Sequence, residues 1–483
     1  MSRWWPTAAL LIVLTGCDGT PSGSVPTSQP PGAASYAQWQ PAISDPREDS
    51  YYPAQGDPGI DALHYGLDLT WDPEAQHLTG VATIAFRVPL QADRVQLDLL
   101  RVLDVTDVAL DGRPATFRQR GNDLLVDGTF SADSDHTAVI TYDGSPRPVP
   151  APTTRDDFDS VGWRTVDTGA EVGEVWAMQE PYGSFTWFPS NDQPSDKAFY
   201  DFVLRVPKEW VGIANGQLTS ASVDGDTRVM TWHLSHPAAT YLTTIAIGDY
   251  VRTSRSSASG VPIDFWTRRG DPGDAARLDR APEIMDWLES KLGPYPFDSL
   301  GFVVVPGMSG METQTMITLG DNQYATSSEV IEHEMVHQWY GDLVTPTDWR
   351  DVWMNEGMTM FLQMAWQADQ AGVPIDQEVD GYRLLEISSR AEAGPPGRYL
   401  KGTFGQGNIY YSPALMWNQV RHQLGDERFW EMVRAWPQAH AYGNATRAQY
   451  YRWLQANYGI ERSFLDGWIM GKVTPLMNNV TPS

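Results

Sequence analysis

The sequence has one cysteine and few basic residues. Because its 483 residues include no second cysteine, no disulfide can form within one chain. There are 34 basic residues against 61 acidic ones, and the formal net charge is −27. Nucleic acid phosphates are contacted through basic surfaces, so this balance argues against nucleic acid as a partner. The chain does have 20 tryptophans and a hydrophobic content of 41%, which are typical of a folded globular protein.

The N-terminal residues resemble an export signal that ends at the cysteine. Arg3 is followed by an apolar run, 8–14, which is too short to span a bilayer as a mature helix. The run leads into Leu14-Thr15-Gly16-Cys17, which resembles a bacterial lipobox. We therefore expect residues 1–17 to be a lipoprotein-type signal peptide, and the exported protein to be lipid-anchored in the cell envelope at Cys17. The alternative is a secreted protein whose cysteine is incidental.

The remaining chain divides into three regions. Residues 18–50 are rich in Pro, Ser, Gly and Thr, which predicts a flexible tether. Within 51–252, apolar residues alternate with polar ones, as between Leu63 and Trp71, and Asp-Gly pairs indicate hairpin turns. This region is predicted to be an all-β domain. Residues 253–483 are predicted to be mainly helical, with a short buried strand at 302–305 and helices over 279–292 and 412–424.

One predicted helix of the last region holds a His-Glu-x-x-His motif. His333 and His337 lie four residues apart, so on a helix both imidazoles can reach one metal ion. Glu334 lies beside them, where its carboxylate can accept a proton from water that the metal activates. Residues 326–329 resemble a capping box, which places the start of the helix just before the motif. Glu356 can supply the third ligand of a tetrahedral zinc site from a second helix, although two packed histidines without a metal are the alternative.

The residues around these motifs resemble the aminopeptidase N family of zinc metallopeptidases, the gluzincins. The resemblance is carried by 333–345, by Trp353-Met354-Asn355-Glu356-Gly357, and by shorter matches at 65–69, 187–192 and 293–297. It implies a multidomain α+β fold, in which the all-β N-terminal domain precedes a mainly helical thermolysin-like catalytic domain. It also implies one Zn²⁺ per chain. The family's usual large C-terminal helical domain is expected to be absent, because the sequence stops at Ser483.

The resemblance further implies a substrate site for peptides with a free N-terminus. The Gly-x-Met-Glu-Asn motif of the family appears as Ser309-Gly310-Met311-Glu312-Thr313, so Glu312 falls on the glutamate that binds the substrate's α-ammonium. Gly310 and Met311 lie in the same motif, while Ser309 and Thr313 depart from it. Glu180 falls on a second family carboxylate, although the Gln expected two residues earlier is Met178, with Gln179 beside it.

The family's catalytic tyrosine falls on Tyr410, and Tyr411 is the competing choice. Ser412-Pro413 is predicted to begin a helix, which would leave Tyr410 just before it with a free hydroxyl. The implied activity is removal of N-terminal residues from peptides, with Glu334 as the base and Tyr410 as an oxyanion donor. Two rivals remain open, a zinc endopeptidase with the same site and a non-catalytic surface peptide-binding lipoprotein. No residue pattern indicates an epoxide-hydrolase side activity.

Overall fold

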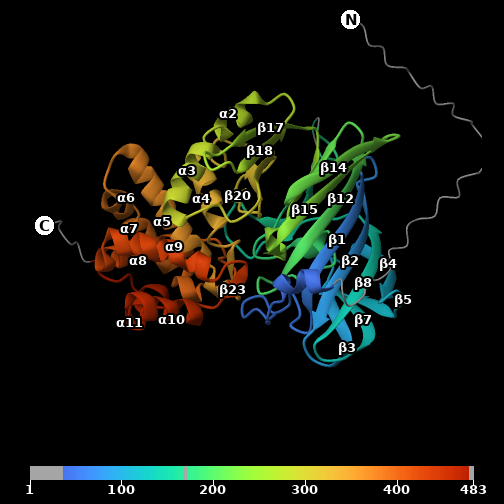
Figure 1. Cartoon of the computed structure of the whole chain (residues 1–483), viewed down its shortest axis with the longest axis horizontal. Helices are drawn as coiled ribbons and strands as arrows, with labels where there is room; N and C mark the ends of the chain where they lie inside the picture. Colours follow the sequence, from blue (N-terminus) through green and yellow to red (C-terminus); the bar gives the residue numbers. More distant parts are fainter. Residues whose placement is uncertain (1–35, 168, 170, 478–483) are drawn as a thin grey trace, which may run out of the picture.

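The computed structural model describes residues 36–477 apart from 168 and 170, and it has two parts that lie side by side (Figure 1). The first part is built of strands and the second mainly of helices, which confirms the predicted fold class. Among the described residues, no helix is long and apolar enough to cross a membrane. The predicted signal peptide, 1–17 with Cys17, and residues 18–35 of the predicted tether lie outside the described residues.

An eight-stranded sheet forms the centre of the first part. Strand β1 (Asp61–Asp72) runs antiparallel to β2 and parallel to β12. Every second side chain from Tyr65 to Trp71 is buried and those between are half-buried or exposed, which confirms the predicted alternation. The order is β14-β15-β12-β1-β2-β8-β4-β5, with β2 (His77–Val88), β4 (Leu103–Leu110), β5 (Arg113–Pro114), β8 (Ser134–Gly144), β12 (Lys197–Pro207), β14 (Gln217–Asp224) and β15 (Thr227–Ala239).

The predicted Asp-Gly hairpin between β4 and β5 is present. Asp111 and Gly112 have φ angles of 51° and 74°, the left-handed values that a type I′ turn requires at both central positions. Leu110 pairs with Arg113 across this turn.

Two smaller sheets complete the first part and share its core. The ring centroids of Trp71 on the eight-stranded sheet and Trp163 on the smaller five-stranded sheet lie 5.1 Å apart. Burial of such aromatic side chains stabilises the contact between the sheets. The first small sheet has the order β3-β7-β6 and the second β13-β16-β11-β10-β9, with β3 (Ala92–Asp98), β6 (Phe117–Arg120), β7 (Asp123–Phe130), β9 (Val149–Pro150), β10 (Ser160–Thr165), β11 (Val175–Met178), β13 (Val211–Ala214) and β16 (Ile245–Gly248).

The second part begins with a five-stranded sheet. Its central strand β19 (Leu300–Val305) is buried along its whole length, which confirms the predicted buried strand at 302–305. The order is β17-β18-β19-β21-β20, with β17 (Tyr250–Ser256), β18 (Pro262–Arg268), β20 (Gly310–Met311) and β21 (Met316–Gly320). Helices α2 (Pro272–Leu278) and α3 (Ala281–Leu292) follow β18. The sequence predicts a helix over 279–292, which corresponds to α3, but misses α2, and Asp279 precedes α3 and pairs with Arg255.

The other helices pack around α5 (Trp353–Ala371), which contacts α4, α6 and α8. Gly372 ends α5 with a φ of 66°, in the left-handed region that favours glycine. The helical elements are α4 (Ser328–His337), η4 (Trp349–Asp351), α6 (Ile375–Gly381), α7 (Arg383–Ala393), η5 (Pro396–Arg398), α8 (Asn408–Leu424), α9 (Asp426–Ala439), α10 (Arg447–Tyr458) and α11 (Arg462–Ile469), and the strands β22 (Val344–Pro346) and β23 (Gly443–Ala445) pair beside them.

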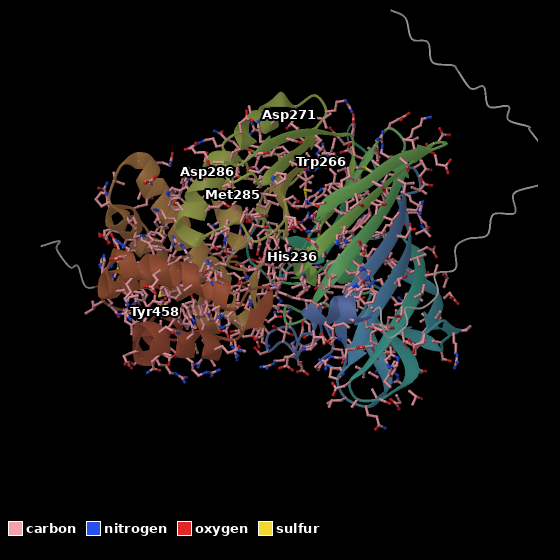
Figure 2. The ribbon with its side chains drawn as sticks, viewed as in Figure 1. His236, Trp266, Asp271, Met285, Asp286 and Tyr458 are labelled. Carbon is pink, nitrogen blue, oxygen red and sulfur yellow. The ribbon has the colours of Figure 1, made fainter. Side chains whose placement is uncertain are left out.

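Aromatic side chains join the two parts, and Figure 2 labels two of them at the boundary. His236 at the end of β15 stacks on Tyr442 of the helical part, with ring centroids 4.6 Å apart. Trp232 on β15 meets Trp266 on β18 edge to face at 5.8 Å. Such contacts bury large apolar surfaces and fix one part against the other.

The predicted start of α8 is wrong. The helix begins at Asn408, and Tyr411 N donates to Gly407 O at 2.8 Å, so its first turn is complete before Pro413. Pro413 is the sixth residue of α8, so the N–H that it lacks would have bonded to Ile409 O, and the bond that closes the first turn does not depend on it. Pro413 packs so closely on Gly357 of α5 that a Cβ at Gly357 would collide with it. Tyr410 therefore lies inside the first turn of α8.

The described end of the predicted tether, residues 36–50, is packed against the protein, whereas the sequence predicts a free tether. Tyr36 is buried, and its hydroxyl lies 2.6 Å from Thr137 Oγ1. The short helix η1 (Ala37–Ala42) lies against β1 and β12. Composition alone marked this segment as a linker, but its aromatic and apolar side chains find partners on the sheet.

Candidate active site

The His-Glu-x-x-His motif lies on α4 at the wall of a cavity of about 680 Å³. Ser327 is the N-cap of α4, and its hydroxyl accepts a hydrogen bond from Val330 N at 3.4 Å. Ile331, Met335 and Val336 are fully buried behind the helix, so the motif faces the cavity. The residues that line the cavity include Arg155, Glu180, Gly310, Met311, Glu312, His333, Glu334, His337, Glu356, Tyr410 and Tyr411.

Three side chains of this wall converge on one point. His333 Nε2 lies 3.2 Å from Glu356 Oε2, and His337 Nε2 lies 3.3 Å from the same oxygen. Zinc bonds of about 2.0–2.2 Å in a tetrahedron place neighbouring ligand atoms about 3.4 Å apart. The three residues therefore fit a zinc ion with one position left for water or substrate.

Both imidazoles are held with Nε2 toward this point. His333 Nδ1 lies 2.9 Å from Gln363 Oε1, and His337 Nδ1 lies 3.0 Å from Tyr340 O. Because an oxygen partner at Nδ1 keeps the ring proton there, Nε2 is free to bind a metal.

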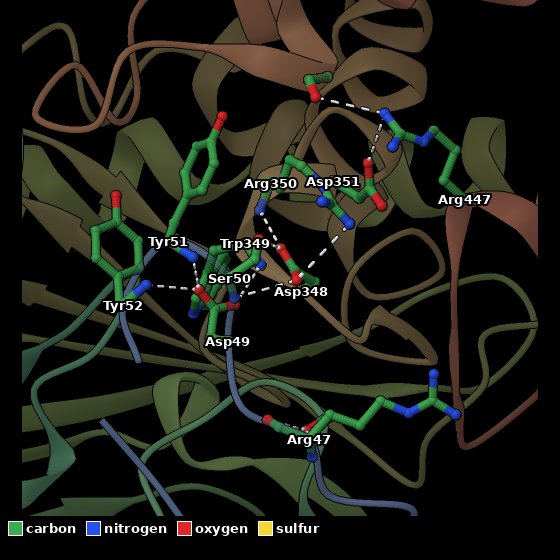
Figure 3. Close-up of polar contacts among 12 residues, drawn as sticks. Arg47, Asp49, Ser50, Tyr51, Tyr52, Asp348, Trp349, Arg350, Asp351 and Arg447 are labelled. Carbon is green, nitrogen blue, oxygen red and sulfur yellow. Dashed lines mark hydrogen bonds and ion pairs between the residues drawn. The ribbon is translucent and has the colours of Figure 1, made fainter. Parts of the chain in front are cut away.

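The N-terminus of α5, which carries Glu356, is fixed by a segment far away in sequence (Figure 3). Trp349 N donates to Asp49 Oδ2 at 2.6 Å, and the Ser50 hydroxyl donates to Asp348 Oδ1 at 2.8 Å. These bonds hold the turn η4 immediately before α5. The end of the predicted tether thus helps to place a candidate metal ligand.

The electrostatics of the His-His-Glu cluster favour a cation at its centre. Burial would raise the pKa of Glu356, but His337 and His333 outweigh it and lower that pKa to about 2. Burial would lower the pKa of His337, but the carboxylates of Glu312 and Glu356 outweigh it and hold that pKa well above its usual value. Glu356 is therefore an anion, and His337 holds a proton unless a metal displaces it.

Three further carboxylates face the same cavity. Glu180, Glu312 and Glu334 are all buried, and burial raises the pKa of each one, with neighbouring carboxylates acting in the same direction. Within the described residues, Glu180 Oε1 and Glu312 Oε1 have no hydrogen-bond partner. Buried, unpaired acceptors at one end of a cavity are suited to a cationic donor.

The strand β20 places Glu312 beside the motif helix. Gly310 pairs with Leu319 of β21, and a Cβ at Gly310 would collide with Glu334 Oε1, so any larger residue there would displace the Glu334 carboxylate. Glu312 O accepts a hydrogen bond from Gln338 Nε2 at 3.2 Å. Thr313, a departure from the family motif, is buried, and its hydroxyl bonds to Met316 O within the same turn.

Gln179 and Glu180 are neighbours in sequence, but their side chains point to different parts of the structure. Gln179 Nε2 donates to Thr243 Oγ1 at 2.9 Å, and Gln179 Oε1 accepts from Trp187 Nε1 at 2.9 Å. Both polar atoms of the Gln179 side chain therefore form hydrogen bonds within the β-rich part. Glu180, the next residue, turns toward the cavity instead.

Tyr410 also lines the cavity, and its ring centroid lies 6.0 Å from that of His333. Burial raises the pKa of Tyr410, and Glu356 adds to the effect, so the hydroxyl keeps its proton. Tyr411 also reaches the cavity, where its ring packs against Tyr382 at 5.5 Å.

Sequence reasoning missed Arg155, whose Nη1 lies 3.4 Å from the Tyr410 hydroxyl. It lies in an irregular loop between β9 and β10, where no periodicity or motif marks it.

Comparisons with known proteins agree with this geometry. The Peptidase M1 N-terminal domain matches residues 61–242, and the Peptidase family M1 domain matches 276–391. "Aminopeptidase M1" of Arabidopsis thaliana is 26% identical over 449 residues, and "Aminopeptidase N" of Acetobacter pasteurianus is 27% identical over 327 residues. The matched regions cover 85% and 62% of this chain, and 50% and 88% of those proteins. The chain thus spans half the length of the Arabidopsis relative.

A solved structure has the same fold over nearly its whole length. The M1 zinc metallopeptidase of Deinococcus radiodurans, in a variant bound to a Tyr-ser-ala substrate, superposes with a TM-score of 0.79 and 22% identity. The superposition covers 89% of this chain and 98% of that one. Both M1 domains match the chain in this order, the two-part fold is shared, and a His-His-Glu cluster lies on the predicted motif. The chain therefore belongs to peptidase family M1.

Proposed function

We propose that this protein is a zinc-dependent aminopeptidase that removes N-terminal residues from peptides. The observation that carries the proposal is the pair of buried carboxylates, Glu180 and Glu312, with unpaired oxygens in the cavity that holds the His-His-Glu cluster. A free α-ammonium would supply the missing donors and favour the ionised form of both carboxyl groups. An N-blocked peptide or an internal segment of a chain cannot do so, which argues against the endopeptidase alternative.

The residues of the site divide the work of hydrolysis. One zinc ion, held by His333, His337 and Glu356, would polarise the substrate carbonyl and make an attacking water more acidic. Glu334 accepts the proton of that water and returns it to the leaving amine. The Tyr410 hydroxyl donates a hydrogen bond to the carbonyl oxygen as it gains negative charge.

The test of the chemistry is Glu334→Gln with its zinc content measured by mass spectrometry. Glutamine keeps the shape of the side chain but cannot accept the proton, so we expect full zinc occupancy and a loss of about 10²–10⁴-fold in kcat. Glu392→Gln, on an exposed glutamate of α7, is the matched control and should keep normal rates. Normal turnover by the Glu334 variant would contradict the assignment. A wild-type protein that holds zinc but shows no turnover would instead favour the peptide-binding alternative.

We also propose that the protein is exported and lipid-anchored at Cys17. The support is the lipobox-like run Leu14-Thr15-Gly16-Cys17 that ends an apolar stretch. Fractionation of producing cells tests it. The wild type is expected in the membrane fraction and the Cys17→Ser variant outside it, and equal distributions would favour simple secretion.

A further inference from the structure

Arg155 is the one lysine or arginine among the described residues that line the cavity. It belongs to the β-rich part, yet its guanidinium reaches the first turn of α8. Asp157 binds it at two points, Nε to Oδ1 at 3.0 Å and Nη2 to Oδ2 at 2.6 Å. Nη1 donates to Gly405 O at 3.2 Å and to Tyr410 Oη at 3.4 Å. The planar guanidinium is therefore fixed on two edges, and its orientation toward Tyr410 is set.

The backbone around Arg155 is tied to the segment that leads into α8. Phe404 N donates to Pro152 O at 3.0 Å, and the Gln406 side chain donates to Thr154 Oγ1 at 2.8 Å. These bonds join the two parts of the chain within a few residues of Tyr410. A change in the position of this loop would therefore move the guanidinium relative to the phenol.

The chemistry of the two groups gives this contact a direction. A guanidinium can only donate hydrogen bonds, whereas a tyrosine hydroxyl can donate one and also accept. When Nη1 donates to Tyr410 Oη, it occupies a lone pair on the side of the β-rich part. The hydroxyl proton must then point elsewhere, and the neighbouring cation makes the phenol a stronger donor. The positive charge of Arg155 also opposes the effect of burial on the pKa of Tyr410.

We propose that Arg155 is a positioning residue that orients the Tyr410 hydroxyl toward the carbonyl oxygen of the scissile bond. The β-rich domain thereby takes part in stabilising the transition state, in addition to supplying Glu180. Arg155 itself makes no bond to the reacting atoms. The proposal rests on the proposed aminopeptidase function, because it gives Tyr410 a carbonyl oxygen to meet.

A double-mutant cycle separates this role from a purely structural one. The four proteins are the wild type, Arg155→Met, Tyr410→Phe and the double variant, each assayed as the zinc-loaded enzyme on an aminoacyl-arylamide with a free amine. If Arg155 acts through Tyr410, Arg155→Met should lower kcat about tenfold to hundredfold with little change in KM. The same substitution should cause no further loss once Tyr410→Phe is present. Equal losses in both backgrounds would overturn the proposal.

Two further measurements keep the test decisive. If Tyr410→Phe leaves no measurable rate, calorimetric binding of a phosphinic dipeptide analogue replaces kcat, because it imitates the tetrahedral transition state. Arg155→Lys, which keeps the charge, should restore part of the loss, and Arg147→Met on the exposed stretch before β9 should behave as wild type. If Arg155→Met is unfolded by its melting curve, Asp157→Asn, which releases the guanidinium, should show a smaller loss with the same dependence on Tyr410. An inactive wild type would count against the proposed function, whereas an active one with additive losses counts against Arg155 alone.

Discussion

Replacing Glu312 with glutamine should remove much of the preference for a free N-terminus. Glu312 is 3% exposed, and within the described residues its Oε1 has no hydrogen-bond partner. A bound ammonium would therefore contact a carboxylate that is almost completely shielded from solvent. Two unit charges 4 Å apart interact by about 4 kcal/mol at an effective dielectric constant of about 20. That energy corresponds to a factor of about 10³. Glu180 remains in the variant and retains part of the attraction.

We therefore expect Glu312→Gln to lower kcat/KM for free aminoacyl-arylamides by about 10²–10³-fold. Both kcat and KM should change, because the anchor also aligns the carbonyl. Rates on N-acetylated substrates should stay at the low wild-type level. The assay compares each substrate with its acetylated form, with zinc content measured in parallel and Glu392→Gln as the control. A variant that kept its zinc and an undiminished preference for free amines would refute the role of Glu312.

Three other outcomes follow from the same geometry. Although burial opposes it, the carboxylates of Glu312 and Glu356 help His337 to hold a proton that competes with the metal. Zinc affinity should therefore rise up to about tenfold per pH unit from pH 6 to 8, and a flat profile in a chelator competition would contradict this. Gly310→Ala should keep zinc but lose most turnover, because the new Cβ displaces the Glu334 carboxylate, and normal kinetics would show that the loop can shift. Gln363→Leu should weaken zinc binding about 10–100-fold, because it removes the oxygen that His333 Nδ1 contacts. An unchanged dissociation constant for zinc would show that this contact is dispensable.

The sequence is most informative where chemistry depends on regular spacing. Two histidines four residues apart must share a helix face, so the convergence of His333 and His337 follows from the period of the helix. The alternation along β1 likewise predicts which side chains are buried. Glu312 could be set beside this helix only through the family resemblance, because separation in sequence says nothing about distance in space. Glu356 could be offered as a third ligand from its residue type and predicted helix, but its distance from the histidines could not be predicted.

The sequence is least informative where irregular backbone brings distant segments together. Arg155 meets Tyr410 across 255 positions, and neither residue lies in a pattern that points to the other. The segment 36–50 reads as a linker by composition, yet Asp49 binds the turn before α5 through a single backbone amide. Pro413 was mistaken for a helix start, because local rules cannot tell a first-turn proline from one that packs on the glycine of a neighbouring helix.

The most direct test of the central claim is hydrolysis of matched arylamide pairs, one free and one N-acetylated, by the wild-type protein. The reaction is followed with zinc present, after removal of the metal with a chelator, and after zinc is restored. We expect rapid cleavage of the free amines only, which the chelator abolishes and added zinc restores. Comparable cleavage of the acetylated substrates would contradict it, because an ammonium anchor would then have no part in catalysis.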